Sequence, residues 1–206
     1  MKSEYNKICL VVVCTITFLT ACGQKGKIYD NGVVINGVKW ATCNVDKVGT
    51  FADTPESAGM FYQWNRKTAW AANGDVFGWH SENAIGDQWE KINDPSPVGW
   101  RVPTHEDFLS LLDSTKVSSI FTTQNGIEGR EFRDIETGVT MFLPAVSYRY
   151  ADDGTLALVY VGAYGNYWSS TQYDSNYSYF LRFASESIDC GYRNRSLGYT
   201  IRSVAE

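Results

Sequence analysis

Apolar and polar residues alternate along this chain in several short runs, separated by Gly, Asn, Asp and Pro. The clearest run is 177–183, where Tyr177, Tyr179, Leu181 and Phe183 occupy alternate positions and predict a half-buried strand. A continuous apolar run at 139–146 predicts a second strand, interrupted by Pro144. Two β-forming runs flank Asn36-Gly37 and predict a tight hairpin within 31–40.

Only one stretch shows clear helical spacing. Apolar residues recur there at intervals of three and four, as Phe108, Leu109, Leu111 and Leu112. Thr104 precedes them as an N-cap, and Asp107 stands where a capping box has its acidic partner. The helix is predicted to start after Thr104 and to end between Asp113 and Lys116. A rigid turn containing Pro97 and Pro103 leads into it, and Trp100 within that turn is expected to be buried.

The remaining segments are less regular. The aromatic run 58–64 is expected to enter the core, whereas 65–94 loses its periodicity and predicts a long irregular loop. The segment 118–132 is interpreted as a short connector. The runs 188–192 and 198–204 are predicted to form a final hairpin around Asn194-Arg195-Ser196.

The N-terminus carries an export signal. Lys2 and Lys7 precede an apolar run, 8–19, that is shorter than the ~20 residues needed to span a bilayer. Leu19-Thr20-Ala21-Cys22 then resembles the bacterial lipobox, in which the cysteine receives the lipid. Residues 1–21 are therefore expected to be a lipoprotein signal peptide, 22–30 a tether and 31–206 the domain. The alternative is an uncleaved anchor helix.

Lipidation at Cys22 predicts an envelope protein, expected at the outer membrane, because several acyl chains hold a protein on a bilayer stably. No acidic run follows Cys22, which favours a position facing the periplasm. The net charge is -5 and no basic block occurs, so nucleic acid is excluded as a partner. The membrane is the partner predicted directly from sequence.

The five cysteines fall into groups. Cys9 and Cys14 leave with the signal, Cys22 takes the lipid, and Cys43 and Cys190 remain in the domain. An exported protein meets an oxidising compartment, so Cys43 and Cys190 are candidates for a disulfide. The alternative is two small buried thiols that never meet.

Five sequence blocks carry a resemblance to a known family: Val38-Lys39-Trp40-Ala41, Gly59-Met60-Phe61-Tyr62-Gln63-Trp64, Gly99-Trp100-Arg101-Val102-Pro103-Thr104, Tyr167-Trp168-Ser169-Ser170 and Tyr199-Thr200-Ile201-Arg202-Ser203-Val204. Over about residues 31–205 the chain resembles the Fibrobacter succinogenes major paralogous domain family, which is common in bacterial lipoproteins. That family is similar to C-type-lectin-like folds and to the sulfatase-modifying-factor group. The resemblance implies an α+β, C-type-lectin-like mixed domain with small twisted antiparallel sheets, one or two helices, long loops and paired termini.

Neither a metal nor another cofactor is expected. The chain lacks the Glu-Pro-Asn or Gln-Pro-Asp loop of calcium-dependent lectins, and its two histidines show no metal-binding spacing. Three carboxylate-rich turns, at 93–94, 152–154 and 174–176, are interpreted as ordinary turns in which Asp and Asn bond their own backbone. The paired late cysteines of formylglycine-generating relatives are absent, since Cys190 stands alone.

Aromatic residues are the strongest candidates for ligand binding. Trp40, Trp64, Trp100 and Trp168 lie in the family blocks and are expected in the core. The candidates for an exposed platform that stacks on sugars lie outside those blocks: Trp70, Trp79, Trp89, Tyr148, Tyr150 and Tyr164.

The sequence thus predicts an envelope-anchored, non-catalytic lipoprotein domain that binds glycans or a partner protein. Two alternatives remain open at this level. One is an enzyme related to the formylglycine-generating sulfatase-modifying factors, which requires a reactive thiol at Cys43 or Cys190. The other is a structural subunit of a surface assembly.

Overall fold

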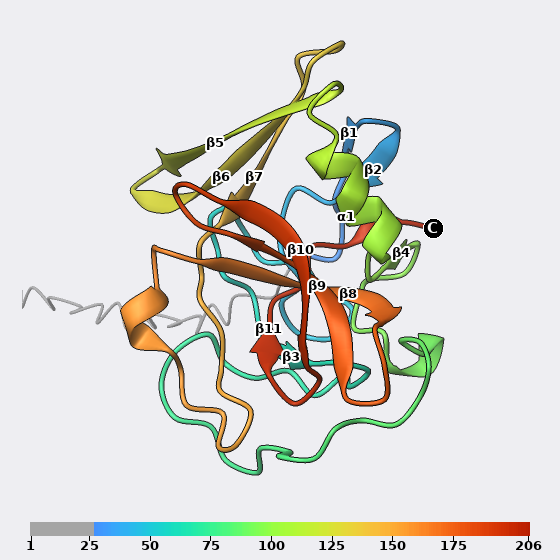
Figure 1. Ribbon diagram of the computed structural model, residues 1–206, viewed down its shortest axis with the longest axis vertical. Coiled ribbons are helices and arrows are strands. Elements are labelled where there is room, and N and C mark those ends of the chain that lie inside the picture. The colour runs from blue at the N-terminus through green and yellow to red at the C-terminus, as the bar shows by residue number, and fades with distance from the viewer. Residues whose placement is uncertain (1–26) are drawn as a thin grey trace, which may run out of the picture.

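The computed structural model describes residues 27–206 (Figure 1). Strands make up 37% of the described residues and helices 8%, and the sheets are four small antiparallel ones. The expected α+β, C-type-lectin-like class is therefore wrong, and the fold is predominantly β. The reason is that the described part holds a single α-helix of eight residues, which is too short to form a layer. The expected signal peptide, residues 1–21, and the expected lipidation site Cys22 lie outside the described residues.

The two ends of the domain meet in one sheet, in the order β1-β2-β12-β4. Its strands are β1 (Val33–Ile35), β2 (Val38–Trp40), β4 (Trp100–Arg101) and β12 (Val204–Ala205). Asn36 and Gly37 both have positive φ, at 45° and 79°, as the predicted two-residue hairpin requires. Val204 lies opposite Trp40, so the expected pairing of the termini is present.

A second sheet contains β5 (Val117–Gln124), β6 (Ile127–Asp134) and β7 (Thr140–Pro144). The interpretation of 118–132 as a connector is wrong, because β5 and β6 form a long hairpin that turns at Asn125-Gly126. This hairpin extends away from the centre of the molecule (Figure 1). Most of its side chains are polar, which removes the apolar alternation that marks a strand in sequence.

A third sheet lies at the centre and contains β8 (Gly165–Gln172), β9 (Tyr177–Phe183) and β10 (Ile188–Asn194). The predicted strand at 177–183 is confirmed. The predicted final hairpin is wrong, because β10 pairs with β9 while β11 (Gly198–Tyr199) pairs with β3 (Tyr62–Gln63). The chain turns away between them because Arg195 is buried rather than placed at a hairpin tip.

Helix α1 (His105–Leu112) has the predicted start. The Thr104 hydroxyl accepts a hydrogen bond from the Asp107 amide, and the Asp107 carboxylate accepts one from the Thr104 amide. Arg101 also donates to Asp107 at 2.7 Å. Phe108 is buried and stacks on Trp40, with the ring centroids 5.5 Å apart, which fixes α1 against the core.

Replacing Asp107 with alanine is expected to lower the free energy of unfolding by about 1–2 kcal/mol at pH 7, because charge-assisted hydrogen bonds are lost. Burial alone would raise the pKa of Asp107, but hydrogen bonds from Arg101 and Thr104 lower it overall. A depressed folded pKa means that this stabilisation is present above the unfolded pKa of ~3.9 and is lost as pH falls through the folded value.

Urea unfolding at pH 7 and at pH 3 measures this, and the difference between wild type and Asp107→Ala should shrink at the lower pH. The neighbouring exposed Glu106, replaced by alanine, is the control and should cost only a few tenths of a kcal/mol. An equal loss of stability for both variants would contradict the capping role of Asp107.

The core is formed by two groups of buried side chains. The first joins α1, the β1-β2 hairpin and the central sheet through residues such as Trp40, Phe108 and Leu181. The second gathers around Trp64, Trp100, Trp168 and Tyr199. All four tryptophans expected in the core are buried, which confirms that prediction.

Among the buried arginines, three are almost completely enclosed, with at most 1% of their surface exposed, and these three hold the loops. Arg149 donates to the carbonyls of Ala71, Asn73, Gly74 and Gly154. Arg195 donates to the carbonyls of Ala84, Gly86 and Asp174, and Arg202 to those of Ala41, Thr42 and Pro55. Within residues 27–206, no carboxylate forms an ion pair with any of the three. Burial lowers the pKa of each guanidinium.

These arginines explain how the long loop at 65–94 is fixed without strands of its own. Arg149 holds its first part and Arg195 its second part, and in Figure 1 the loop runs below the central sheet. Residues 27–30 of the expected tether are also attached, since Lys27 pairs with Phe51 and the Asp30 carboxylate accepts bonds from Gly32 and Thr42. Between residues 27 and 206, no helix is both long and apolar enough to cross a membrane.

Candidate functional site

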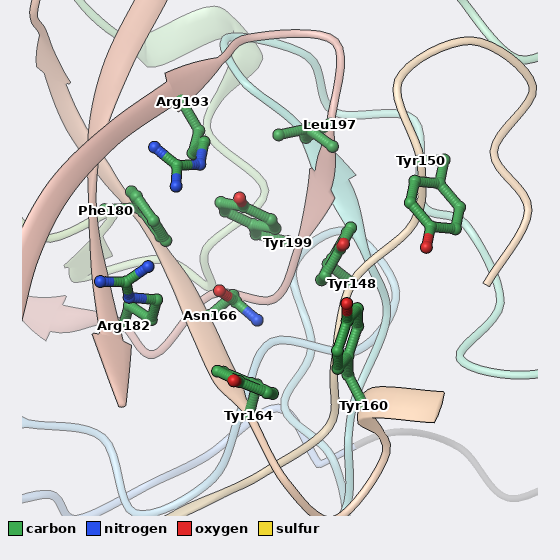
Figure 2. A pocket seen from close by; sticks show the side chains of 10 residues that line it. All are labelled: Tyr148, Tyr150, Tyr160, Tyr164, Asn166, Phe180, Arg182, Arg193, Leu197 and Tyr199. Atoms are coloured by element: carbon green, nitrogen blue, oxygen red, sulfur yellow. The ribbon is translucent and has the colours of Figure 1, made fainter. Parts of the chain in front are cut away.

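A pocket of about 340 Å³ lies between one face of the central sheet and the loop that precedes it. The side chains that line it are mostly aromatic: Tyr148, Tyr150, Tyr160, Tyr164, Asn166, Phe180, Arg182, Arg193, Leu197 and Tyr199 (Figure 2). Figure 2 shows Phe180 and the two arginines on one side, the stacked tyrosines on the other, and Tyr199 and Asn166 between them.

The sheet side of the pocket follows from strand alternation. Phe180 and Arg182 project from β9 on the face opposite to Leu181 and Phe183, which belong to the core. Gly191 of β10 lies directly across from Phe180 and has no side chain to cover the ring. The Arg193 guanidinium lies 5.9 Å from the Phe180 ring centroid. The Phe180 ring is only 2% exposed, so this side of the pocket presents the exposed Arg193 guanidinium over a buried aromatic ring.

The opposite side of the pocket is a group of four tyrosines. Tyr148 stacks on Tyr160 with an interplanar angle of 18° and contacts Tyr150 edge-on. Tyr164 in turn packs edge-on against Tyr160. Between Tyr148 and Tyr150, Arg149 points into the core and bonds the neighbouring loops. The buried guanidinium thus fixes the backbone that presents both tyrosines.

The floor of the pocket is supported by the second core group. The Tyr199 ring lies 4.4 Å from the Trp168 ring and 5.0 Å from Phe180. Burial raises the pKa of Tyr199, and burial together with the Tyr150 hydroxyl raises the pKa of Tyr148 to about 12. These phenols therefore stay neutral near pH 7 and can both donate and accept hydrogen bonds.

The pocket is cationic although the protein is acidic overall, with a net charge of -5. Arg182 is paired with Asp189 at 2.6 Å. Arg193 donates to the Tyr192 carbonyl at 3.0 Å and forms no ion pair within the described part of the chain. None of the lining residues is a carboxylate, histidine, cysteine or serine.

The structure brings together three of the six candidate binding residues, because Tyr148, Tyr150 and Tyr164 all line this pocket. The three tryptophans do not form an open platform. Trp70 and Trp89 are buried, and the half-buried Trp79 donates from its indole nitrogen to the Ala151 carbonyl. Their role is to pack the long loop onto the domain, since Trp70 and Trp79 contact each other at 5.1 Å.

Sequence reasoning missed the other lining residues, namely Tyr160, Asn166, Phe180, Arg182, Arg193, Leu197 and Tyr199. The alternation of 177–183 assigned its second face to solvent. The signal on that face was Phe180, a large aromatic at a position expected to be polar, with Arg182 two residues on. Strand pairing, which places Arg193 and Asn166 beside them, is not readable from the sequence alone.

The two cysteines of the domain are both free thiols and lie in different surroundings. Cys43 is buried in the second core group, whereas Cys190 is half-buried against the first. The structure thus does not form the disulfide left open by the sequence. Burial raises the pKa of the Cys190 thiol to about 12, which disfavours the thiolate that a nucleophile needs.

The carboxylate-rich turns behave as ordinary turns. Asp153 accepts hydrogen bonds from Thr155, and Asp174 accepts them from the amides of Asn176 and Tyr177. Asp94 binds the amides of Ser96 and Val102. Across residues 27–206, no group of three or more His, Cys, Asp or Glu side chains is arranged to hold a metal.

Comparison with known protein families matched residues 129–204 to a domain of unknown function (DUF8237). Every residue that lines the pocket lies inside the matched stretch. No curated protein and no solved structure gave a significant match.

Proposed function

We propose that this protein is an envelope-anchored lipoprotein that binds glycans non-catalytically in the tyrosine pocket. The observation that carries the proposal is a side of partly exposed tyrosines that faces a few convergent polar groups. Sugars present apolar faces that stack on aromatic rings and hydroxyls that need donors and acceptors. The partly exposed Tyr148, Tyr160 and Tyr164 offer the rings, while the tyrosine hydroxyls and Arg193 offer the polar contacts.

The size and chemistry of the pocket support binding rather than catalysis. Its volume of about 340 Å³ is at the lower end of the ~300–1,000 Å³ of small-molecule sites. A pocket of this volume suits the terminal residues of a saccharide chain. Glycoside hydrolysis uses two carboxyl groups facing the bond, and no carboxylate lines this pocket. A lipid at Cys22 would keep the pocket close to the envelope.

Binding of the mature chain in detergent micelles to a glycan array tests the proposal. For any glycan that binds, Tyr160→Ala is expected to weaken the affinity at least tenfold, because stacking on an aromatic ring contributes about 1–3 kcal/mol in comparable sites. Tyr160 belongs to neither buried core group, so the variant should unfold at nearly the wild-type temperature.

Tyr173→Ala is the matched control, since Tyr173 is 46% exposed and lies outside the pocket. Its affinity should equal that of wild type. An array with no bound glycan, or equal affinities for wild type and Tyr160→Ala, would overturn the proposed function.

A further inference from the structure

Of the two arginines that line the pocket, Arg193 is the one that forms no ion pair within residues 27–206. The three core arginines donate to several loop carbonyls each, and Arg182 is paired with Asp189. Among the described residues, the Arg193 side chain makes a single hydrogen bond, to the carbonyl of the preceding residue. A guanidinium has five N–H donors, so most of the donors of Arg193 remain free to bond a ligand or water.

The surroundings of Arg193 determine which chemical group of a ligand it can bind. Its guanidinium lies beside the Phe180 ring, and Figure 2 places it near Tyr199. A ligand that packs an apolar face on the partly exposed Tyr148 and Tyr160 rings would point its opposite edge across the pocket toward Arg193. The planar fork of a guanidinium matches a carboxylate, which it can bind through two parallel hydrogen bonds.

We propose that the pocket selects a sugar residue that carries a carboxylate, and that Arg193 is the residue that recognises this group. The inference rests on the proposed glycan binding and names its ligand class. The charge of Arg182 is balanced by Asp189 at 2.6 Å, so within the described part of the chain Arg193 supplies the unpaired positive charge beside the site. No lining carboxylate repels the incoming anion.

The two sources of such a sugar are uronic acids and nonulosonic acids, and the experiment separates them. Calorimetry on the mature chain in micelles would compare trigalacturonate with its carboxyl-reduced neutral counterpart, and sialyllactose with lactose. One acidic member is expected to bind at least tenfold more tightly than its neutral partner, because a hydrogen bond to a charged group contributes more than a neutral one. The preference should weaken as salt is raised.

Arg193→Gln is expected to bring the ratio of acidic to neutral affinity close to one while leaving the neutral affinity unchanged. Arg193→Lys keeps the charge without the fork and should retain part of the preference. Arg133→Gln, at an exposed arginine on β6, is the matched control and should keep the whole preference. Circular dichroism of each variant verifies the fold.

The outcomes separate the two proposals. Sugar binding that depends on Tyr160 but shows no acidic preference overturns the role of Arg193 and leaves glycan binding standing. A preference that survives Arg193→Gln, or tighter binding of a sulfated than of a carboxylated sugar, has the same consequence. Binding of neither acidic nor neutral sugars overturns both.

Discussion

Replacing Arg202 with methionine is expected to lower the free energy of unfolding by about 3–5 kcal/mol. Arg202 is fully buried and donates to Asn44 Oδ1 at 2.8 Å and to the Thr42 carbonyl at 2.6 Å. Methionine fills much of the volume but leaves these acceptors without donors, and each orphaned acceptor costs about 1–3 kcal/mol. The expected loss is smaller than the sum of these penalties, because the substitution also removes a buried charge whose desolvation is unfavourable.

Urea unfolding of the mature chain at pH 7 measures this change. Arg133→Met is the matched control, because Arg133 is exposed on β6, and it should alter stability by less than about 0.5 kcal/mol. Arg202→Lys should fall between the two, since an ammonium reaches fewer of the acceptors. A loss below about 1 kcal/mol for Arg202→Met would show that the loop carbonyls do not depend on this arginine.

The elements that sequence predicted are those whose signals are local. The turn at Asn36-Gly37 needs only two residues with positive φ, and the start of α1 needs only Thr104 and Asp107. The strand at 177–183 shows its core face through Leu181 and Phe183. Each of these features is decided within a few residues, so distant pairing cannot change it.

The features that sequence missed depend on distant partners. Polar strands such as β5 and β6 are stabilised by pairing with each other and with β7, not by an apolar face of their own. Arg149, Arg195 and Arg202 look like surface residues until the fold places loop carbonyls around them. This dependence also explains the fold class, because loops held by buried arginines take the place of helical layers.

For the same reason, the sequence predicted only part of the candidate site. Tyr148, Tyr150 and Tyr164 could be named because they are aromatic residues in loop-like sequence. The tryptophans of the long loop had the same signal but are used to pack that loop, with Trp79 bonded to Ala151. The arginines can be assigned to the pocket only once the pairing of β9 with β10 is known.

Replacing Trp168 with alanine is expected to lower the free energy of unfolding by about 3–5 kcal/mol, the usual cost of emptying a buried aromatic site. Trp168 is fully buried, and its indole nitrogen donates to the Tyr62 carbonyl at 2.8 Å. Its ring also supports Tyr199 in the pocket floor, so glycan affinity should fall even in the folded fraction. Thermal unfolding and glycan titration of the same samples measure the two effects.

Two phenylalanine variants separate the hydrogen bond of Trp168 from its packing. Trp40 is equally buried, but its indole nitrogen has no hydrogen-bond partner within residues 27–206, so Trp40→Phe loses packing alone. Trp168→Phe loses similar packing and also leaves the Tyr62 carbonyl without its indole donor. Trp168→Phe should therefore cost about 1–2 kcal/mol more than Trp40→Phe. Equal losses of stability for Trp168→Phe and Trp40→Phe would mean that the indole hydrogen bond contributes nothing. Unchanged glycan affinity in Trp168→Ala would mean that Tyr199 keeps its position without the Trp168 ring.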